Sequence, residues 1–273
     1  MNMEQTLSKQ EVSEAQRVFV YNHKKHHYFV TFMRIIILLI FLTLWEVAAR
    51  MQWIDTFFFS SPSLVAGYFV KMLMDGSFFM HTGITLFETL VSFFLITIIS
   101  LLFSTMLWYS KTFAEILEPY LVVLNSLPKS ALAPLIIVWL GTGTDTIIVA
   151  GISVAVFGSI INLYTGFKQA DAEKLKLIIT LGGNRFTSFT KVILPSSVPL
   201  LLSNMKVNIG LALVGVIIGE FLAARRGLGY LIIYGSQVFQ LNMVITSIII
   251  LCFIAMGLYQ CLQWAEHFYL KHK

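Results

Sequence analysis

The sequence has 273 residues, of which 57% are hydrophobic and only 12% are charged, against roughly 25% charged residues in ordinary soluble domains. Its mean hydropathy is +0.80, and its 19 basic and 14 acidic residues are too few to cover a soluble domain of this length. These figures exclude a soluble globular protein and a disordered chain. They predict an all-α protein that crosses a membrane several times.

Residues 1–28 read as a polar tail ahead of a membrane domain that covers residues 29–273. The tail lacks the apolar core of a signal peptide, and it contains His23, Lys24, Lys25, His26 and His27. We interpret this cluster as a cationic anchor beside membrane lipid. A metal site is the alternative, but no carboxylate or Cys stands nearby to complete one, so we predict no metal.

Six segments are long and apolar enough to span a membrane, for which about 20 residues are needed. Three carry no charge, and the other three are interrupted by one or two charged residues. In chain order the predicted spans are Phe29–Ala49, Thr89–Trp108, Pro119–Leu140, Thr146–Phe167, Val198–Leu222 and Leu241–Trp264.

The distribution of basic residues predicts the orientation, because cytoplasmic loops collect Lys and Arg. With both termini inside, the cytoplasmic segments contain Lys9, Arg17, Lys24, Lys25, Arg34, Lys111, Lys168, Lys174, Lys176, Arg185, Lys191, Lys271 and Lys273. The exterior segments then contain only Arg50, Lys71, Arg225 and Arg226. The net charge of +5 is therefore typical of membrane topology and gives no reason to expect a nucleic-acid partner.

The exterior segment 51–83 contains Trp53 and a run of three Phe residues, and the stretch Ser61-Pro62-Ser63 favours the start of a short helix. Aromatic residues gather at the lipid headgroups, so a segment lying on the membrane is preferred over a substrate pocket. Cys252 and Cys261 fall nine residues apart in one apolar run, roughly 13 Å along a helix, which is too far for a disulfide.

The loop between the fourth and fifth spans, residues 168–195, is the most informative segment. Leu175, Ile178, Ile179, Gly182, Phe186 and Phe189 follow a helical period and predict one apolar face. Gly182-Gly183 interrupts the pattern and favours a short helix, a turn and a second helix. A basic, amphipathic loop of this length indicates a docking surface, and the alternative is a helix lying on the inner membrane face.

At these residues the chain resembles the permease subunits of bacterial ABC importers, whose loop reads Glu-Ala-Ala, three residues, Gly, nine residues and Ile-x-Leu-Pro. Here Gly182 is followed by nine residues and Val192-Ile193-Leu194-Pro195, while Lys176-Leu177-Ile178 replaces Glu-Ala-Ala. Further matches resemble the nitrate, sulfonate and taurine group of permeases. They are Ser126-Leu127-Pro128, Ala131-Leu132-Ala133-Pro134, Trp139-Leu140-Gly141-Thr142-Gly143, Glu220-Phe221 and Gly227-Leu228-Gly229-Tyr230-Leu231.

The resemblance implies a permease dimer, two ATP-binding ABC subunits and an extracellular substrate-binding protein. It also implies a cytoplasmic coupling helix between spans four and five that seats in the ATPase, with the contact made by Lys176, Leu177, Ile178, Gly182, Arg185, Leu194 and Pro195. The chain contains no phosphate-binding G-x-x-x-x-G-K-[ST] loop and no constellation of catalytic residues. We therefore expect no cofactor, and we expect ATP hydrolysis in a separate partner.

Charged residues inside spans are costly and default to a functional hypothesis. Lys129 stands between Pro128 and Pro134, which would loosen the helix, so Asn125, Ser126 and Lys129 are expected to line the translocation path. The alternative is that Lys129 extends to the membrane surface or pairs with a carboxylate such as Glu88.

Glu220 is a candidate gate residue of the path, with a local or intersubunit ion pair as the alternative. Lys206 is expected to extend toward the cytoplasm. Glu46 and Glu88 are expected to make polar contacts inside the bundle, and the sequence assigns them no further role.

The sequence thus predicts a membrane-spanning permease subunit of an ATP-driven importer in the bacterial cytoplasmic membrane. The resemblance favours a small anion such as a sulfonate, taurine or nitrate, and a thiamine precursor or riboflavin remains an alternative. An ion-coupled secondary transporter would show two inverted halves, which the sequence lacks. A membrane scaffold without transport is the third possibility, and the charges within the spans argue against it.

Overall fold

The computed structural model describes residues 14–271, without the side chains of residues 14–24, 27 and 270. Most of the predicted His-Lys-Lys-His-His cluster and residues 1–13 of the predicted tail therefore lie outside the described part. Two compact units are distinguished, residues up to Ser63 and residues from Leu64 onward. The first contains α1 (Glu14–Arg50), α2 (Thr56–Phe59) and the start of α3 (Pro62–Met74). Every regular element in the described residues is a helix.

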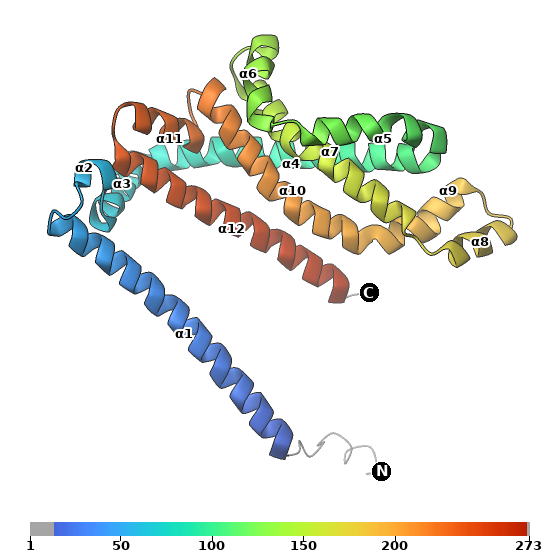
Figure 1. Ribbon diagram of the computed structural model, residues 1–273, viewed down its shortest axis with the longest axis horizontal. Coiled ribbons are helices and arrows are strands. Elements are labelled where there is room, and N and C mark those ends of the chain that lie inside the picture. Colours follow the sequence, from blue (N-terminus) through green and yellow to red (C-terminus); the bar gives the residue numbers. More distant parts are fainter. Residues whose placement is uncertain (1–13, 272–273) are drawn as a thin grey trace. The chain divides into compact units, whose positions relative to one another are not determined.

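The second unit continues from α3 through nine further helices and one π-helical turn (Figure 1). They are α4 (Ser77–Tyr109), α5 (Lys111–Ser126), α6 (Lys129–Leu140), α7 (Thr144–Lys168), α8 (Ala172–Thr180), α9 (Arg185–Ser188), η1 (Phe189–Ile193), α10 (Leu194–Ala223), α11 (Leu228–Gln237) and α12 (Leu241–Lys271).

In the first unit, Glu46 connects the end of α1 to the beginning of α3. Its Oε1 accepts a hydrogen bond from Arg50 Nε at 2.7 Å, and its Oε2 accepts one from the backbone N–H of Ser63 at 3.0 Å. The carboxylate thus satisfies a backbone donor in the first turn of α3, where such donors lack a helical partner. The predicted polar contact of Glu46 is therefore a local cap.

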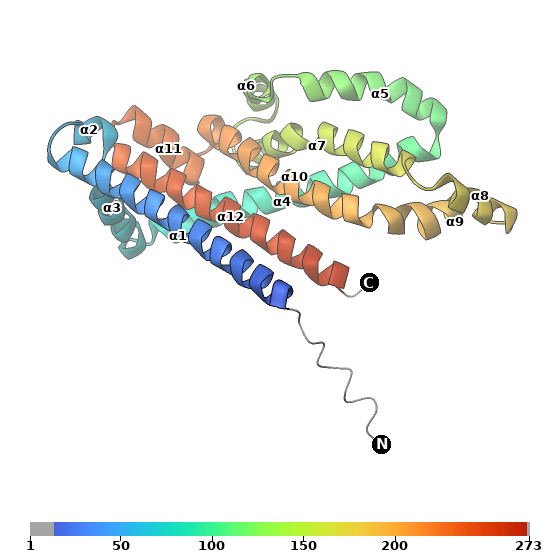
Figure 2. The same cartoon turned by 60° about the horizontal axis from the view of Figure 1, so that its bottom comes forward.

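The core of the second unit is formed by α4, α7 and α10, which run side by side in both ribbon views (Figures 1 and 2). The helices approach closely because small residues meet at their crossing. A Cβ atom added at Gly215 of α10 would lie 2.8 Å from the Cα of Gly151 in α7, and one added at Gly151 would lie 2.6 Å from Ser92 Oγ of α4. Small residues at such crossings let membrane helices pack backbone to backbone.

Some polar side chains inside this core are paired with one another. The hydroxyl of Ser159 in α7 accepts hydrogen bonds from Asn204 Nδ2 at 2.6 Å and from Asn208 Nδ2 at 2.8 Å, and all three residues are buried. Lys206 on the same helix forms a 2.6 Å ion pair with Glu266 of α12. In this structure Lys206 is therefore held by a carboxylate between two helices, whereas the sequence predicted that it extends to the cytoplasm.

Among the described residues 14–271, five helices are long and apolar enough to cross a membrane, and the bent pair α5–α6 makes a sixth if it counts as one span. This agrees with the six predicted segments and the all-α fold, with two corrections. The second span begins at Ser77 instead of Thr89, because Glu88 lies buried within the helix and does not end it. The third is broken at Leu127–Pro128 by 99°, where a continuous span was predicted.

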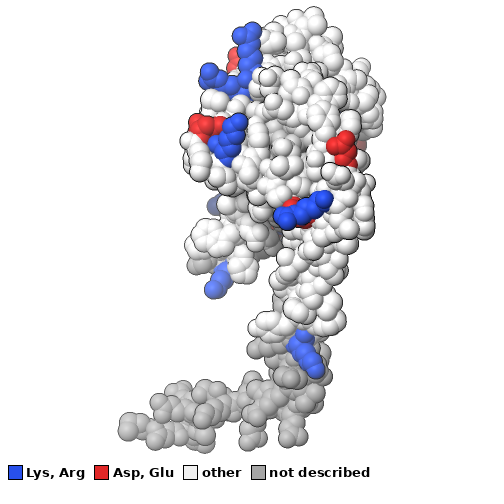
Figure 3. Space-filling model, turned by 90° about the vertical axis from the view of Figure 1, so that its left-hand side faces the viewer, with Lys and Arg blue, Asp and Glu red and all other residues white. Residues whose placement is uncertain are grey.

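Charged side chains are sparse on the surface, as a membrane protein requires. In Figure 3 they gather in a few small groups and leave most of the visible face uncharged. Cys252 and Cys261 are both exposed and free, which confirms the prediction that they do not bridge. The short helix predicted near Ser61-Pro62-Ser63 is α3, which begins at Pro62.

Candidate functional site

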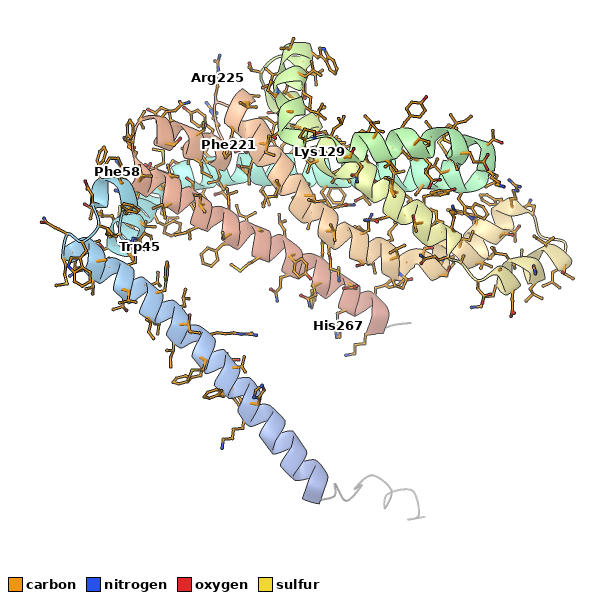
Figure 4. The ribbon with its side chains drawn as sticks, in the orientation of Figure 1. Trp45, Phe58, Lys129, Phe221, Arg225 and His267 are labelled. Carbon is orange, nitrogen blue, oxygen red and sulfur yellow. The ribbon has the colours of Figure 1, made fainter. Side chains whose placement is uncertain are left out.

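The break in the third span places three of the predicted path residues together. Helix α5 ends at Ser126, because Pro128 disfavours helical backbone at Leu127 and lacks an N–H to continue the ladder. Asn125 and Ser126 are exposed at the end of α5, and Lys129 begins α6 (Figure 4).

Lys129 compensates for the broken ladder. The last carbonyl groups of a helix have no partner within it, and Lys129 Nζ donates hydrogen bonds to the carbonyl oxygens of Leu124 at 2.6 Å and Asn125 at 2.9 Å. The same ammonium group lies 5.6 Å from the centre of the Phe157 ring. Its partners are thus backbone carbonyls, and the alternative pair with Glu88 is not formed.

Glu220 lies fully buried near the end of α10 and organises the loop that follows. Its Oε1 accepts a hydrogen bond from Thr85 Oγ1 of α4 at 2.6 Å, and its Oε2 accepts one from the backbone N–H of Gly229. Thr85 Oγ1 in turn accepts from the N–H of Leu228 at 2.8 Å. One carboxylate therefore joins α4, α10 and the first turn of α11.

A histidine on α4 completes this arrangement, which we call the loop latch and define as His81, Thr85, Glu220 and residues 227–229. His81 Nδ1 lies 3.0 Å from the backbone nitrogen of Gly227 and 3.1 Å from its carbonyl oxygen. Gly227 has φ +119, and a Cβ there would collide with the Glu220 carboxylate. Only glycine fits this conformation and this close approach.

The loop latch corrects one interpretation of Glu220. The sequence suggested a local ion pair with the basic residues that follow, but in the described part of the chain Glu220 forms no ion pair and binds neutral donors. Arg225 and Arg226 are exposed beyond the end of α10 (Figure 4 labels Arg225).

The loop between α7 and α10 lies at the opposite end of these helices from the loop latch (Figures 1 and 2). Asp171 caps α8 by accepting hydrogen bonds from the N–H groups of Glu173 and Lys174, and these bonds lower the pKa of the Asp171 carboxyl. The chain then turns at Gly182, whose φ is +80, and Asn184 caps α9. The predicted helix, turn and second helix are thus observed.

Two contacts anchor the loop to the membrane helices. Arg185 Nη1 donates a 2.7 Å hydrogen bond to the carbonyl oxygen of Tyr109, at the end of α4. Phe189, in the π-helical turn, packs against Trp108 and Phe167 at ring-centroid distances of 5.5 and 5.6 Å. A displacement of α8 and α9 would therefore pull directly on the ends of α4 and α7.

The loop carries four exposed apolar side chains, which together we call the loop patch. Its members are Leu177, Ile179, Leu181 and Phe186, with exposures of 57%, 64%, 74% and 64%. The single apolar face predicted from the period is wrong, because the turn at Gly182 divides it. Leu175 and Ile178 are half-buried and Phe189 is buried, whereas Ile179 and Phe186 of the same pattern are exposed.

The remaining predicted coupling residues are also partly exposed and partly packed against the membrane helices. Lys176 and Gly182 are exposed beside the loop patch, and nothing lies within 4 Å of a Cβ built on Gly182. Leu194 begins α10 and is half-buried against Phe167 and Phe189, and Pro195 in the first turn of α10 is exposed.

Sequence reasoning missed the partners of Glu220. Thr85 lies 135 residues before Glu220 in the chain, and His81 lies 146 residues before Gly227. In the sequence, only the closely spaced Gly227 and Gly229 after Glu220 indicated that the chain passes close to this carboxylate.

Comparison with known proteins agrees with this architecture. Residues 96–265 match the family model described as the binding-protein-dependent transport system inner membrane component. The chain is 29% identical over 222 residues to the riboflavin transport system permease protein RibX of Chloroflexus aurantiacus, covering 81% of this chain and 83% of the relative. It is 24% identical over 224 residues to the taurine transport system permease protein TauC of Escherichia coli, covering 80% and 81%.

Solved structures show the same fold. The MetNI methionine ABC transporter in an inward-facing form matches with a TM-score of 0.59 and 18% identity, covering 69% of this chain and 92% of the matched chain. An amino acid ABC transporter crystallised with histidines matches with a TM-score of 0.56 and 16% identity, covering 75% and 98%. The family match covers more than half of the sequence, so the chain belongs to the binding-protein-dependent inner membrane components and is a membrane-spanning permease subunit of an ABC importer.

Proposed function

We propose that the loop patch is the surface on which the separate ATPase subunit docks, and that its movement drives alternating access of the spans. The observation that carries this proposal is the combination of an exposed apolar surface with a rigid anchor. Leu181 is 74% exposed, while Arg185 and Phe189 hold the same short loop to α4 and α7. Exposed apolar groups rimmed by polar ones are typical of an interaction site.

We place the loop patch and both termini in the cytoplasm and the loop latch outside. The excess of Lys and Arg in residues 168–195 and at the chain ends supports this orientation. An extracellular binding protein then delivers the solute at the end of α10, and a second permease copy completes the membrane assembly.

The transported solute is, in this proposal, a small anion such as a sulfonate, taurine or nitrate. Relatives named for taurine and aliphatic sulfonates support it, and relatives named for riboflavin and formylaminopyrimidine keep a vitamin or thiamine precursor as the alternative. The path follows Asn125, Ser126 and Lys129 at the broken span, with Glu220 at the exterior end. Because the chain belongs to a family of ABC permeases, nothing supports the two alternative functions, an ion-coupled transporter and a membrane scaffold.

Docking is tested by placing a charge in the loop patch. In Leu181→Glu, a carboxylate would have to lose its water against an apolar groove, which is unfavourable without a partner. We expect normal amounts of the chain in the membrane, weakened co-purification of the ATPase and loss of uptake. Gly182→Asp adds a charge in the adjacent turn, where space is open but the φ of +80 strains any side chain, and it should also weaken association and uptake.

The matched control is Val238→Glu, which makes the same kind of change at an exposed position after α11, at the other end of the unit. It should leave ATPase association at the wild-type level. Normal association and uptake in both loop variants would show that this surface does not dock the ATPase.

The orientation is tested with single cysteines at Gln5 and Ser77 in a background without Cys252 and Cys261. A membrane-impermeant thiol reagent should label Ser77→Cys in intact cells and Gln5→Cys only after the membrane is opened. Labelling of both from outside would contradict the proposed topology.

A further inference from the structure

A pocket of about 480 Å³ lies between the α8–α9 loop and the turn that joins α4 to α5, at the same end of the unit (Figures 1 and 2). Trp108 and Lys111, before and after the turn, form one side, and residues of the loop form the other. The volume is sufficient for a small ligand. Of the loop patch, Ile179 alone belongs to the lining that the structure describes, so the proposed docking surface does not account for this pocket.

The polar groups of the pocket include donors that the protein leaves unused. Ser188 is only 4% exposed, and its hydroxyl forms no hydrogen bond within residues 14–271, which is costly for a buried group. Asn184 Oδ1 accepts from the backbone N–H and the hydroxyl of Thr187 at 2.9 and 3.0 Å, so the amide nitrogen of Asn184 remains as a donor. Together these groups favour a ligand with several acceptor oxygens.

Arg185 is positioned to add further donors. Its Nη1 donates to the carbonyl oxygen of Tyr109 at 2.7 Å, and its other N–H groups have no partner in the described part of the chain. One bond thus holds the guanidinium group at the edge of the pocket and leaves the rest of its planar fork available. This fork matches the oxygens of a phosphate group.

The charge of the pocket is positive. Lys111 and Arg185 are charged, and no carboxylate is among the lining residues that the structure describes. Lys111 lies 3.7 Å from Glu115, but the two side chains are 91% and 66% exposed, and such a pair contributes little. Lys111 is also the first residue of α5, where the helix dipole disfavours a cation. An anion in the pocket would compensate for this unfavourable position.

The apolar part of the lining restricts the kind of anion. Trp108, Leu175 and Ile179 line the pocket beside the donors. Trp108 lies in the last turn of α4, a helix long enough to span the membrane, and Trp is enriched at the level of the lipid headgroups. An inorganic anion would gain nothing from these apolar side chains, whereas a phospholipid brings a phosphate and acyl chains to the same place.

We propose that this pocket binds the headgroup of an anionic phospholipid from the cytoplasmic leaflet. The phosphate lies against Lys111, Arg185 and the Ser188 hydroxyl, and the start of the acyl chains lies against Trp108 and Leu175. Basic pockets between membrane helices bind lipid headgroups in this way. The choice of leaflet rests on the proposed function. A lipid bound here joins the turn after α4 to the α8–α9 loop and steadies the segment that carries the loop patch.

An anionic lipid is favoured over a zwitterionic one. A phospholipid with a choline headgroup has the same phosphate, but its own cation would meet the two basic side chains. Phosphatidylglycerol carries no such cation, and its hydroxyl groups can accept from the Asn184 amide. Each charge-assisted hydrogen bond contributes about tenfold or more in affinity, so the two lipids should differ clearly.

The test uses the full chain purified in a nonionic detergent and native mass spectrometry, which resolves the first bound lipid. Phosphatidylglycerol and phosphatidylcholine with identical acyl chains are titrated separately. We expect phosphatidylglycerol to bind at least about tenfold more tightly. Glycerol 1-phosphate, the headgroup phosphate without acyl chains, distinguishes a lipid from a soluble phosphate compound, and it should fail to displace the lipid at millimolar concentration.

Variants assign the preference to this pocket. Lys111→Gln, at an exposed position that leaves the fold intact, should reduce the preference for phosphatidylglycerol by about tenfold, and Lys111→Arg should retain it. Ser188→Ala should weaken binding by about two- to tenfold. The matched control is Lys191→Gln, the same change at an exposed lysine of the loop outside the described lining, which should stay within about twofold of wild type. Gel filtration of each variant checks its fold.

Equal affinity for the two lipids, a wild-type preference in Lys111→Gln, or displacement of the lipid by glycerol 1-phosphate would overturn the proposal. So would a double variant Lys111→Gln/Ser188→Ala that keeps the lipid preference and loses only ATPase association, because the pocket would then be part of the docking surface. The lipid measurement needs no ATPase. A chain that failed to dock the ATPase would therefore still show the lipid preference, and the two proposals fail separately.

Discussion

Replacing Glu220 by alanine removes the centre of the loop latch, and the structure gives the size of the expected effect. The carboxylate accepts from Thr85 Oγ1 at 2.6 Å and from the Gly229 N–H, and the residue is 0% exposed. Glu220→Ala leaves both donors buried. The Gly229 N–H is fixed at the start of α11 and has no second acceptor within the loop latch.

Two estimates bracket the loss of stability. A buried donor that loses its partner costs about 1–3 kcal/mol, which gives about 2–6 kcal/mol for two donors. Hydrogen bonds between membrane helices average only about 0.6 kcal/mol, because alternative partners are often found. Thr85 can turn its hydroxyl to another acceptor, whereas the loop amide cannot, so we expect a loss of about 2–4 kcal/mol.

The free energy of unfolding is measured in detergent micelles by titration with SDS and followed by far-ultraviolet circular dichroism. Glu220→Gln, which keeps one acceptor, should lose less than Glu220→Ala. Glu115→Gln, a change at an exposed carboxylate on α5, should stay within about 0.5 kcal/mol of wild type. An unfolding curve for Glu220→Ala that coincides with wild type would refute the reasoning, because these hydrogen bonds would then not hold the loop.

Three further predictions concern other parts of the unit. Gly215→Val should destabilise the fold by about 1–3 kcal/mol or more, measured as above, because its Cβ would meet the Cα of Gly151 at 2.8 Å. Gly210→Ala on the same helix, where nothing lies within 4 Å, should be near neutral. The lowered pKa of Asp171 means that its cap contributes stability above the unfolded pKa of about 3.9, and that this contribution is lost as the pH falls through the folded pKa. The protection of the α8 amides, which is their exchange rate relative to the intrinsic rate at the same pH, should therefore fall at acidic pH in the wild type and stay unchanged in Asp171→Asn, and an equal fall in both would contradict the cap. Lys129→Met should accelerate hydrogen exchange at the α5–α6 break, because two carbonyl groups lose a charged donor, and unchanged exchange would mean that Lys129 does not hold the break.

Local features of the fold could be predicted from the sequence because they depend on neighbours in the chain. Apolar runs of sufficient length identified the spans, and the Gly182-Gly183 pair identified the turn between α8 and α9. The proline at position 62 marked the start of α3. Each of these signals reflects the conformational preference of a few consecutive residues.

Features that depend on packing between helices could not be predicted in the same way. A charged residue in an apolar run predicts the end of a span, but Glu88 is buried within α4. Pro128 indicated a weakened helix, but it did not give the size of the bend, which is 99°. The apolar face of the loop was predicted wrongly because a helical period was carried across Gly182, where the φ of +80 ends the helical backbone.

The most direct test of the central claim is reconstitution of the chain in liposomes with and without its ATPase subunit and binding protein. The account predicts that uptake requires all three together with ATP, and that the chain alone shows neither ATP hydrolysis nor uptake driven by a proton or sodium gradient. Leu181→Glu in the complete system should lose ATP-driven uptake. Robust gradient-driven uptake by the chain alone would contradict the assignment of the energy source to a docked ATPase.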